Sequence, residues 1–389
     1  MKELEYPFDA AYIIKKRKSL KKALLADGTS RIRKKIAVLG GSTTSDIVKT
    51  LELFLLDAGI EPEFYESEYA QYFQDAMFPD ETLLSFKPDI VFIHTTNRNV
   101  TDWPEMTDTT EQIDEKLHTE LNRFTAMWKS IAEKFHCPII QNNFEMPLYR
   151  LLGSRDAWDI HGRTNFLTRL NEAFYAYARE NESFYIHDLN FVSADYGLKE
   201  WSNPLFWNMY KYAMCFEAIP SFAFSVSHII KSIFGKNKKA LALDLDNTLW
   251  GGVVGDDGVD GIEIGQETGV SQSYYEFQTY VKQLKSLGIV LTVCSKNDHE
   301  NAIAGLNHPE GALRPDDFVI IKANWENKDR NIAETAAELN ILPDSIVFAD
   351  DNPAEREIVR TQIKGAAVPD MDGVENYITR RLTAAASLK

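Results

Sequence analysis

The run Ala240-Leu241-Ala242-Leu243 is followed directly by Asp244-Leu245-Asp246-Asn247-Thr248. A short apolar run that ends in a polar turn is typical of a buried strand in a parallel sheet. Further apolar runs lie at residues 289–293, 318–321 and 345–349, and helical patterns lie near residues 271–287, 298–306, 328–339 and 353–361. Strands that alternate with helices indicate parallel strands joined by crossover helices. The sequence therefore predicts a doubly wound α/β domain that starts at this stretch.

Polar side chains follow each predicted strand of this domain. In strand order they are Asp244 with Asp246, Ser295, Lys322 with Lys328, and Asp350 with Asp351. Because the carboxyl ends of parallel strands meet at one edge of the sheet, we expect these side chains to lie close together. Phosphoryl transfer needs a nucleophile, an acid/base, a divalent cation and donors that neutralise the transferring oxygens. Carboxylate and carbonyl oxygens suit Mg²⁺ as the cofactor, so the pattern predicts a magnesium-dependent phosphoryl-transfer site.

These motifs resemble those of the haloacid dehalogenase (HAD) superfamily of phosphatases and phosphotransferases. The resemblance implies that Asp244 is the nucleophile that forms an aspartyl-phosphate. It implies that Asp246 protonates the leaving group and activates the acceptor, and that its backbone carbonyl binds Mg²⁺. Lys328 is expected to pair with the nucleophile and the phosphate, because it opens the helix predicted within residues 325–332. Lys322 remains the alternative.

The same resemblance gives binding roles to other residues of this edge. Thr248 is expected to support the loop, and Ser295 is expected to donate a hydrogen bond to a phosphoryl oxygen. Asn297 is grouped with them as a substrate-binding residue. Asp350 is expected to be the acidic Mg²⁺ ligand beside Asp244 and Asp246. Asp351 is expected to be a second ligand or to support Asp350.

A closer resemblance is to the FkbH-like group of that superfamily, of the HAD-IIIC phosphatase type. It rests on residues 243–258, 295–297, 324–328 and 348–356, and it covers most of the chain. The segment Gly251–Gly261 is too short for a separate cap domain, so we expect a minimal hairpin flap that leaves the nucleophile open to a large acceptor. Members of this group take a phosphoglyceryl donor, lose phosphate and load the glyceryl unit onto an acyl-carrier protein. The resemblance implies that activity as one option, with the carrier as a separate protein.

The first half of the chain predicts a second doubly wound α/β module. Its short apolar runs lie at residues 36–39, 89–93, 138–140 and 183–186. This module resembles the SGNH-hydrolase fold, in which a serine follows the first strand. Ser42 would be that nucleophile, or an N-cap of the next helix, while Asn97 would match the oxyanion-hole asparagine and His187 the base. Because the family's Gly-Asp-Ser and Asp-x-x-His orders are both missing, we expect a degenerate or acceptor-binding module.

The length of 389 residues and the position of the turn residues predict two domains. We expect a helical leader over residues 1–34, an SGNH-hydrolase-like domain over 35–234 and a HAD-like domain over 235–389. The basic residues that cluster between Lys15 and Lys35 are interpreted as a solvated helix and linker. Cys137, Cys215 and Cys294 fit no metal-ligand spacing and indicate reduced thiols.

The composition excludes several classes of partner. The chain is 44% hydrophobic and has a formal net charge of −16, which does not favour binding to nucleic acid or to an anionic membrane. No apolar window approaches the roughly 20 residues that span a bilayer, and the N-terminus has no signal-peptide core. We therefore expect a cytoplasmic enzyme that acts on a phosphorylated small molecule. The alternatives are a metal-independent esterase or acyltransferase that uses Ser42, and a phosphate-binding scaffold protein.

Overall fold

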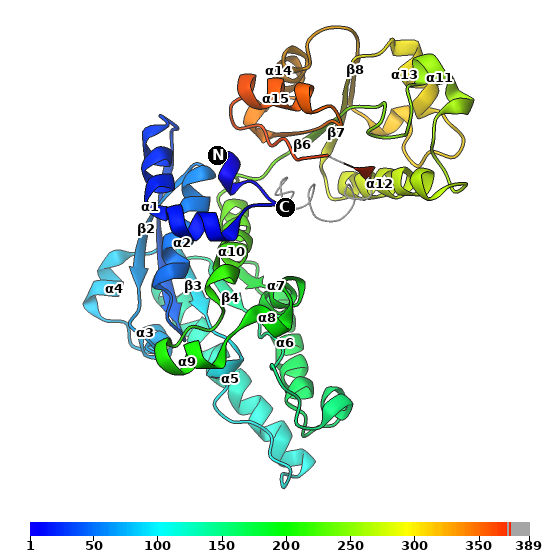
Figure 1. The fold of residues 1–389 in the computed structure, drawn as a ribbon. Helices are drawn as coiled ribbons and strands as arrows, with labels where there is room; N and C mark the ends of the chain where they lie inside the picture. Colours follow the sequence, from blue (N-terminus) through cyan, green and yellow to red (C-terminus); the bar gives the residue numbers. More distant parts are fainter. Residues whose placement is uncertain (372, 375–389) are drawn as a thin grey trace. The chain divides into compact units, whose positions relative to one another are not determined.

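The structure is a computed structural model that describes residues 1–371, 373 and 374. Two compact units divide the chain after Ile233, and the short segment Glu5–Pro7 belongs to the second of them. Each unit contains one parallel β-sheet with helices packed against it (Figure 1). Among the residues described, no helix has both the length and the apolar character needed to cross a membrane.

The first unit has a five-stranded parallel sheet in the order β2-β1-β3-β4-β5. Its strands are β1 (Ile32–Gly40), β2 (Ile60–Glu66), β3 (Ile90–His94), β4 (Ile139–Asn142) and β5 (Phe184–His187). Its α-helices are α1 (Ala10–Ala26), α2 (Ser45–Asp57), α3 (Tyr72–Met77), α4 (Glu81–Phe86), α5 (Thr110–Phe135), α6 (Arg163–Glu180), α7 (Leu189–Tyr196), α8 (Leu198–Trp201), α9 (Pro204–Tyr210) and α10 (Ile219–Ile233). Its 3₁₀ helices are η1 (Lys2–Leu4), η2 (Asn97–Asn99), η3 (Gly153–Ala157) and η4 (Phe216–Ala218).

Helices cover both faces of this sheet, which explains why the central strands are continuous apolar runs. Residues 36–39 of β1 and 90–93 of β3 are fully buried. Helices α5 and α6 supply a core of aromatic side chains to one face, including Phe124, Trp128 and Phe174. Helices α1, α2 and α10 pack together as the other layer. The basic cluster in α1 lies on a partly exposed helix surface, where Arg17 pairs with Asp46 of α2.

Two parts of the first unit differ from expectation. Strand β2 was not expected, because acidic residues alternate with its apolar ones; it is an edge strand, where Pro62 and Glu63 are tolerated. The aromatic-rich stretch at residues 188–218, for which no helix was predicted, contains the short helices α7, α8 and α9. Its carbonyls at Tyr210 and Lys211 accept hydrogen bonds from Thr43, so it covers the carboxyl end of β1.

The second unit has a four-stranded parallel sheet in the order β8-β7-β6-β9. Its strands are β6 (Ala240–Leu243), β7 (Val290–Ser295), β8 (Ile320–Ala323) and β9 (Ile346–Ala349). Its helices are α11 (Val254–Asp257), α12 (Gly269–Ser286), α13 (His299–Leu306), α14 (Lys328–Glu338) and α15 (Pro353–Gln362), with 3₁₀ helices η5 (Val259–Gly261), η6 (Pro315–Asp317) and η7 (Pro343–Ser345). The predicted fold class, two doubly wound parallel sheets, is confirmed. After β6 the chain builds β7 and β8 on one side and returns to β9 on the other, so the switch point lies at the carboxyl end of β6.

Strand β6 buries alternate side chains in two cores, as the period of two requires. Leu241 and Leu243 pack on one face with Phe277 of α12. Ala240 and Ala242 pack on the other face with residues of α14 and α15. With both faces buried, β6 fixes the position of the residues that follow it.

The flap after β6 is small but is not a simple hairpin. Gly251 and Glu263 form an antiparallel bridge, with N–H···O distances of 3.0 Å and 2.8 Å. The chain between them contains the helical turn α11 and the 3₁₀ helix η5 instead of two extended arms. No separate cap domain fits in so short a segment.

Candidate active site

The backbone pairing of β6 with β9 brings two aspartates together. Leu243 pairs with Ala349 in the parallel register, and the N–H of Asp244 donates to the carbonyl of Ala349 at 3.0 Å. The next residue along each strand is therefore an aspartate, Asp244 on one strand and Asp350 on the other. Both are buried, with residue exposures of 7% for Asp244 and 0% for Asp350. Two carboxyl groups held this close in a buried place need positive charge beside them.

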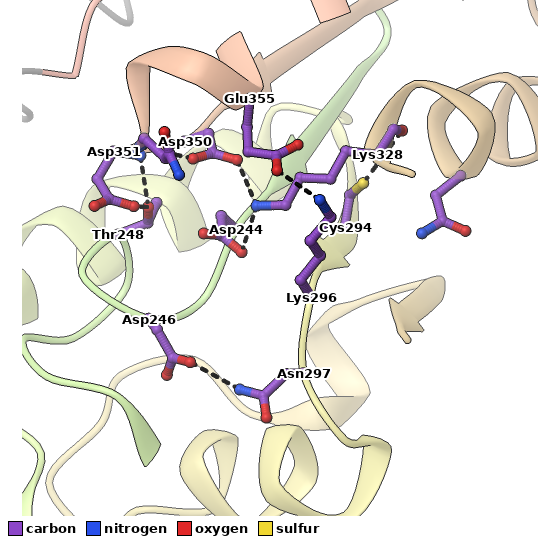
Figure 2. A network of polar contacts seen from close by, with 12 residues as sticks. Asp244, Asp246, Thr248, Cys294, Lys296, Asn297, Lys328, Asp350, Asp351 and Glu355 are labelled. Carbon is purple, nitrogen blue, oxygen red and sulfur yellow. Dashed lines mark hydrogen bonds and ion pairs between the residues drawn. The ribbon is translucent and has the colours of Figure 1, made fainter. Parts of the chain in front are cut away.

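Lys328 supplies part of that charge. It is the first residue of α14, and its Nζ lies 3.1 Å from Oδ1 of Asp244 and 2.5 Å from Oδ2 of Asp350 (Figure 2). Burial alone would lower the pKa of Lys328, but the two carboxylates outweigh burial and raise it. Lys328 therefore stays charged. Lys322 is instead paired with Glu334 and Glu338 of α14, so the structure brings Lys328 to Asp244 and leaves Lys322 outside the site.

A third carboxylate, from Asp351, completes a cluster that could hold a metal ion. Asp244, Asp350 and Asp351 each offer an oxygen, and these atoms lie within 4.8 Å of one another. Thr248 positions Asp351, because its Oγ1 accepts from the Asp351 N–H at 3.1 Å and donates to Oδ1 at 3.4 Å. Predicted as a loop support, Thr248 does hold this loop against β9.

The charges of the cluster fit a divalent cation. Three carboxylates and one ammonium leave two negative charges in a buried place. Burial, followed by the Asp244 carboxylate, raises the pKa of Asp350 to about 6, and the same two causes raise the pKa of Asp351. A bound divalent cation would favour the ionised forms of these carboxyl groups and offset the repulsion between them. The oxygen-only donor set suits Mg²⁺.

Asp246 lies apart from the three clustered carboxylates. Its Oδ1 accepts from the indole N–H of Trp250 at 2.9 Å and from the N–H of Val254 at 3.0 Å, and its Oδ2 accepts from Nδ2 of Asn297 at 2.9 Å (Figure 2). Burial raises the pKa of Asp246. A carboxyl group with a raised pKa and a fixed orientation can donate and accept a proton. Asn297, predicted to bind substrate, holds Asp246 in this structure.

The turn that follows Asp246 depends on Asn247. Its φ of 54° places it in the left-handed region, which Asn tolerates better than most residues. Its side-chain oxygen accepts from the N–H of Gly252 at 3.0 Å. This turn connects the Asp-x-Asp motif to the flap that begins at Gly251.

Three charged residues around this site, Lys296, Glu355 and Arg356, were not predicted as site residues. Lys296 pairs with Glu355 at 2.7 Å, and Ser295, predicted to bind phosphate, is the buried last residue of β7 just before it. Arg356 is buried and donates to the carbonyls of Asp350 and Asp351, at 2.8 Å and 2.6 Å. Their positions within the motifs could have indicated them. Lys296 directly follows the serine at the end of β7, and Glu355 and Arg356 lie in the first turn of the helix after the paired aspartates.

The three candidate residues of the first unit are not brought together. Among the described residues, no hydrogen bond joins any two of Ser42, Asn97 and His187. Nδ1 of His187 lies 2.9 Å from Oδ1 of Asn142, and its Nε2 lies 3.1 Å from Oγ of Ser225. Asn97 donates to the carbonyl of Glu145 at 3.3 Å. Both ring nitrogens of His187 are thus occupied by groups other than Ser42.

Ser42 does not cap a helix either, which corrects the structural expectation for it. It is 2% exposed, and its Oγ has no hydrogen-bond partner among the described residues. Helix α2 begins three residues later, at Ser45, and its N-cap is Thr44. Ser42 lies two residues before the N-cap position, too early to cap the first free N–H groups of the helix.

His187 also lies in an environment that keeps it neutral. Burial lowers the pKa of His187 to about 3, and burial lowers the pKa of His94 to about 3 as well. Both rings pack edge-on against Phe222. Asn142 lies between them and contacts Nδ1 of each ring. This arrangement is a buried packing cluster of neutral imidazoles.

Comparison with known proteins shows which family the chain belongs to. Residues 35–231 match the model of the FkbH N-terminal domain. The structure of the N-terminal part of the protein BF1531 from Bacteroides fragilis, described as containing a phosphatase domain complexed with Mg, is similar over 96% of this chain and 97% of its own, with 31% sequence identity and a TM-score of 0.84. No curated protein sequence matches the chain.

More distant likenesses concern about half of the chain. A putative acylhydrolase from Bacteroides fragilis has 16% identity and a TM-score of 0.32, covering 56% of this chain and 97% of its own. A GDSL-like lipase from Bacteroides thetaiotaomicron has 13% identity and a TM-score of 0.30, covering 56% and 98%. Neither is near enough to assign an activity. The family-model match and the near-complete likeness to the BF1531 structure place the chain in the FkbH family.

Proposed function

We propose that this protein is a Mg²⁺-dependent, HAD-type phosphoryl-transfer enzyme that acts on a phosphorylated small molecule through an aspartyl-phosphate. The observation that carries the proposal is the buried Lys328, whose ammonium bridges Asp244 and Asp350 at the carboxyl ends of two adjacent strands. Residues 235–389 would form the catalytic domain, and residues 35–234 a degenerate or acceptor-binding domain. The description of the BF1531 structure as a phosphatase domain complexed with Mg supports this reading.

In the first step, a carboxylate oxygen of Asp244 attacks the phosphorus of the substrate. A bond forms between that oxygen and phosphorus, and the bond from phosphorus to the leaving-group oxygen breaks. Asp246 donates its proton to the leaving-group oxygen; its raised pKa supports this role. Lys328 stays charged beside Asp244 and neutralises charge on the phosphoryl oxygens. Ser295 donates a hydrogen bond to one of those oxygens.

The three clustered carboxylates have a separate role. Mg²⁺ held by Asp244, Asp350 and the backbone carbonyl of Asp246, with Asp351 as a further ligand, would supply positive charge next to the transferring group. Thr248 and Arg356 keep Asp350 and Asp351 in place through the hydrogen bonds described above.

In the second step, the ionised Asp246 takes a proton from the acceptor. When water is the acceptor, its oxygen attacks the phosphorus, the bond to Asp244 breaks, and phosphate leaves. Asn297 and Trp250 hold the Asp246 carboxylate in position for both proton transfers. In this mechanism Asp244 carries the phosphoryl group, and Asp246 transfers the proton in both steps.

The finer proposal concerns what happens to the rest of the substrate. FkbH-like proteins couple loss of phosphate to loading of a glyceryl unit on an acyl-carrier protein, and we propose a separate carrier protein of that kind as a partner. The short flap between Gly251 and Glu263 supports access by a large acceptor. A metal-independent esterase at Ser42 is not favoured, because that hydroxyl is buried and does not contact His187.

The test is hydrolysis of p-nitrophenyl phosphate by the full chain, with Mg²⁺ and with EDTA. We expect turnover that requires Mg²⁺ and that falls at least about 100-fold in Asp244→Asn, which keeps the shape but removes the nucleophile. Lys322→Met is the control, since Lys322 lies outside the site. Turnover that is equal with Mg²⁺ and with EDTA would reject the proposal, and a folded protein without turnover would favour the scaffold alternative.

A further inference from the structure

Asp246, the proton donor of the proposed reaction, is held differently at its two carboxylate oxygens. Its Oδ1 accepts from the indole N–H of Trp250 at 2.9 Å and from the backbone N–H of Val254 at 3.0 Å. Among the described residues, only Asn297 donates to its Oδ2, at 2.9 Å. Since each carboxylate oxygen has two lone pairs, Oδ1 is fully occupied, and Oδ2 keeps one lone pair for the transferred proton. The donors to Oδ1 therefore decide which oxygen transfers the proton.

Helix α13 supports the hydrogen bonds to both oxygens of this carboxyl group. Asn297, which donates to Oδ2, lies directly before Asp298, the N-cap of the helix. Near the other end of the helix, Gly305 is buried against the indole of Trp250. The helix also packs against α11 of the flap, whose first residue is Val254 (Figure 1). The donors to both oxygens are thus placed by contacts with one helix.

The contact between Gly305 and Trp250 leaves no room for a side chain at residue 305. A Cβ atom there would lie 2.7 Å from Cζ2 and 2.8 Å from Cη2 of the indole, whereas carbon atoms prefer a separation of about 3.5–4.0 Å. Trp250 is 1% exposed, and its backbone forms a bridge with Asp246, so the ring has little freedom to move. Residue 305 is helical, and alanine is a better helix former than glycine. The missing side chain therefore serves the contact with the indole.

We propose that Gly305 is a positioning residue for Asp246: its lack of a side chain lets α13 hold the Trp250 indole where the indole N–H donates to Oδ1. The inference rests on the proposed function, in which Asp246 protonates the leaving group. Gly305 is buried and acts through Trp250. A methyl group at residue 305 would displace the indole and lengthen its hydrogen bond to Asp246. That change would free a lone pair on Oδ1, so the proton would no longer be confined to Oδ2.

The experiment compares two substrates that depend differently on proton donation, hydrolysed by the full chain in Mg²⁺. Phenyl phosphate and p-nitrophenyl phosphate differ in one nitro group, and p-nitrophenolate is the more stable leaving group, so it needs the proton less. The leaving-group ratio is kcat/KM for p-nitrophenyl phosphate divided by kcat/KM for phenyl phosphate. We expect Gly305→Ala to raise this ratio by about tenfold, a part of the roughly 10²–10⁴-fold that general acid–base catalysis contributes. Gly269→Ala is the control, because a Cβ atom at this exposed position of α12 would meet nothing within 4 Å.

A double-mutant cycle with Trp250→Phe tests whether Gly305 acts through the indole. Phenylalanine lacks the N–H and the two ring atoms nearest Gly305, so Trp250→Phe alone should also raise the leaving-group ratio by about tenfold. Adding Gly305→Ala to Trp250→Phe should then raise the ratio no further. If Gly305→Ala alone does not fold, the double variant should fold, because the smaller ring leaves room for the methyl group. Its ratio should equal that of Trp250→Phe.

The outcomes separate the positioning role from the proposed function. No Mg²⁺-dependent hydrolysis of either substrate by wild type, or an unchanged leaving-group ratio in Asp246→Asn, would reject the function assigned to the site. If Asp246→Asn raises the ratio but a folded Gly305→Ala lowers kcat/KM equally for both substrates, or leaves it unchanged, the positioning role alone is rejected. Additive effects of Gly305→Ala and Trp250→Phe, or a double variant that does not fold, also reject it, because Gly305 would then not act through the indole.

Discussion

Asp244 and Asp350 are neighbours because Leu243 and Ala349 pair in the parallel register of β6 and β9. The N–H of Asp244 donates to the carbonyl of Ala349 at 3.0 Å, so backbone hydrogen bonding fixes the distance between the two strand ends. Lys328 then pairs with both carboxylates from the start of α14. The geometry of the site is thus a consequence of sheet pairing, with side chains added at strand ends.

Asp350→Asn should raise the Mg²⁺ concentration needed for half-maximal activity, with a smaller effect on the rate at saturating Mg²⁺. The substitution removes one ligand charge but keeps the shape of the side chain. Asp351→Asn should have the weaker effect, since Asp351 is partly exposed and is held by Thr248 instead of by Lys328. Mg²⁺ titration of both variants, with the exposed Asp316→Asn as control, measures this. A larger shift in Asp351→Asn would make Asp351 the principal ligand.

Without metal, stability should depend on pH through Asp350. Its pKa is raised from 3.8 to about 6, so the folded state holds this proton more tightly than the unfolded chain does. The free energy of unfolding should therefore fall as pH rises through the window between those two values, by an amount on the order of 3 kcal/mol from this group. At pH below both values this contribution is fully present.

Urea unfolding in EDTA across that window, in wild type and in Asp350→Asn, measures the contribution. The variant cannot titrate at this position, so its pH slope should be smaller than that of wild type. Added Mg²⁺ should reduce the wild-type slope, because it favours the ionised carboxylate. Identical slopes in the two proteins would show that Asp350 does not titrate in this range.

Ser42→Ala should leave phosphate hydrolysis unchanged and should have little effect on stability. Its hydroxyl has no partner among the described residues, so removing it breaks no hydrogen bond. Thr44→Ala is the matched comparison: Thr44 donates to Glu66 at 2.7 Å, and its loss should cost about 1 kcal/mol. Chemical denaturation compares the two variants. A fluorophosphonate probe should not label wild type, and stoichiometric labelling confined to Ser42 would contradict this account of the first unit.

The sequence predicted the second sheet well because its signals are local. Each strand is a short apolar run, and polar residues at the ends of β6, β7 and β9 lie at the site, whereas Lys322 of β8 lies outside it. The role of Asn297 could not be read in this way, because it depends on a tertiary contact with Asp246. A side chain that holds a catalytic group has no sequence pattern that separates it from one that binds substrate.

The first unit was harder to predict for different physical reasons. Strand β2 contains acidic residues and Pro62, which an edge strand tolerates and a central strand does not. His187 is at the end of β5 as expected, but its ring points into a buried cluster with Asn142 and Ser225. The position of a residue at the end of a strand does not by itself show what its side chain contacts.

The central claim is that Asp244 carries the phosphoryl group. Rapid acid quenching of the full chain during turnover of a substrate labelled in the transferring phosphoryl group, in Mg²⁺, measures this directly. We predict a protein-bound phosphate that hydroxylamine releases, as expected of an acyl phosphate, that maps to Asp244 and that is absent from Asp244→Asn. Turnover without any such label on Asp244, or an equal label in Asp244→Asn, would contradict the account.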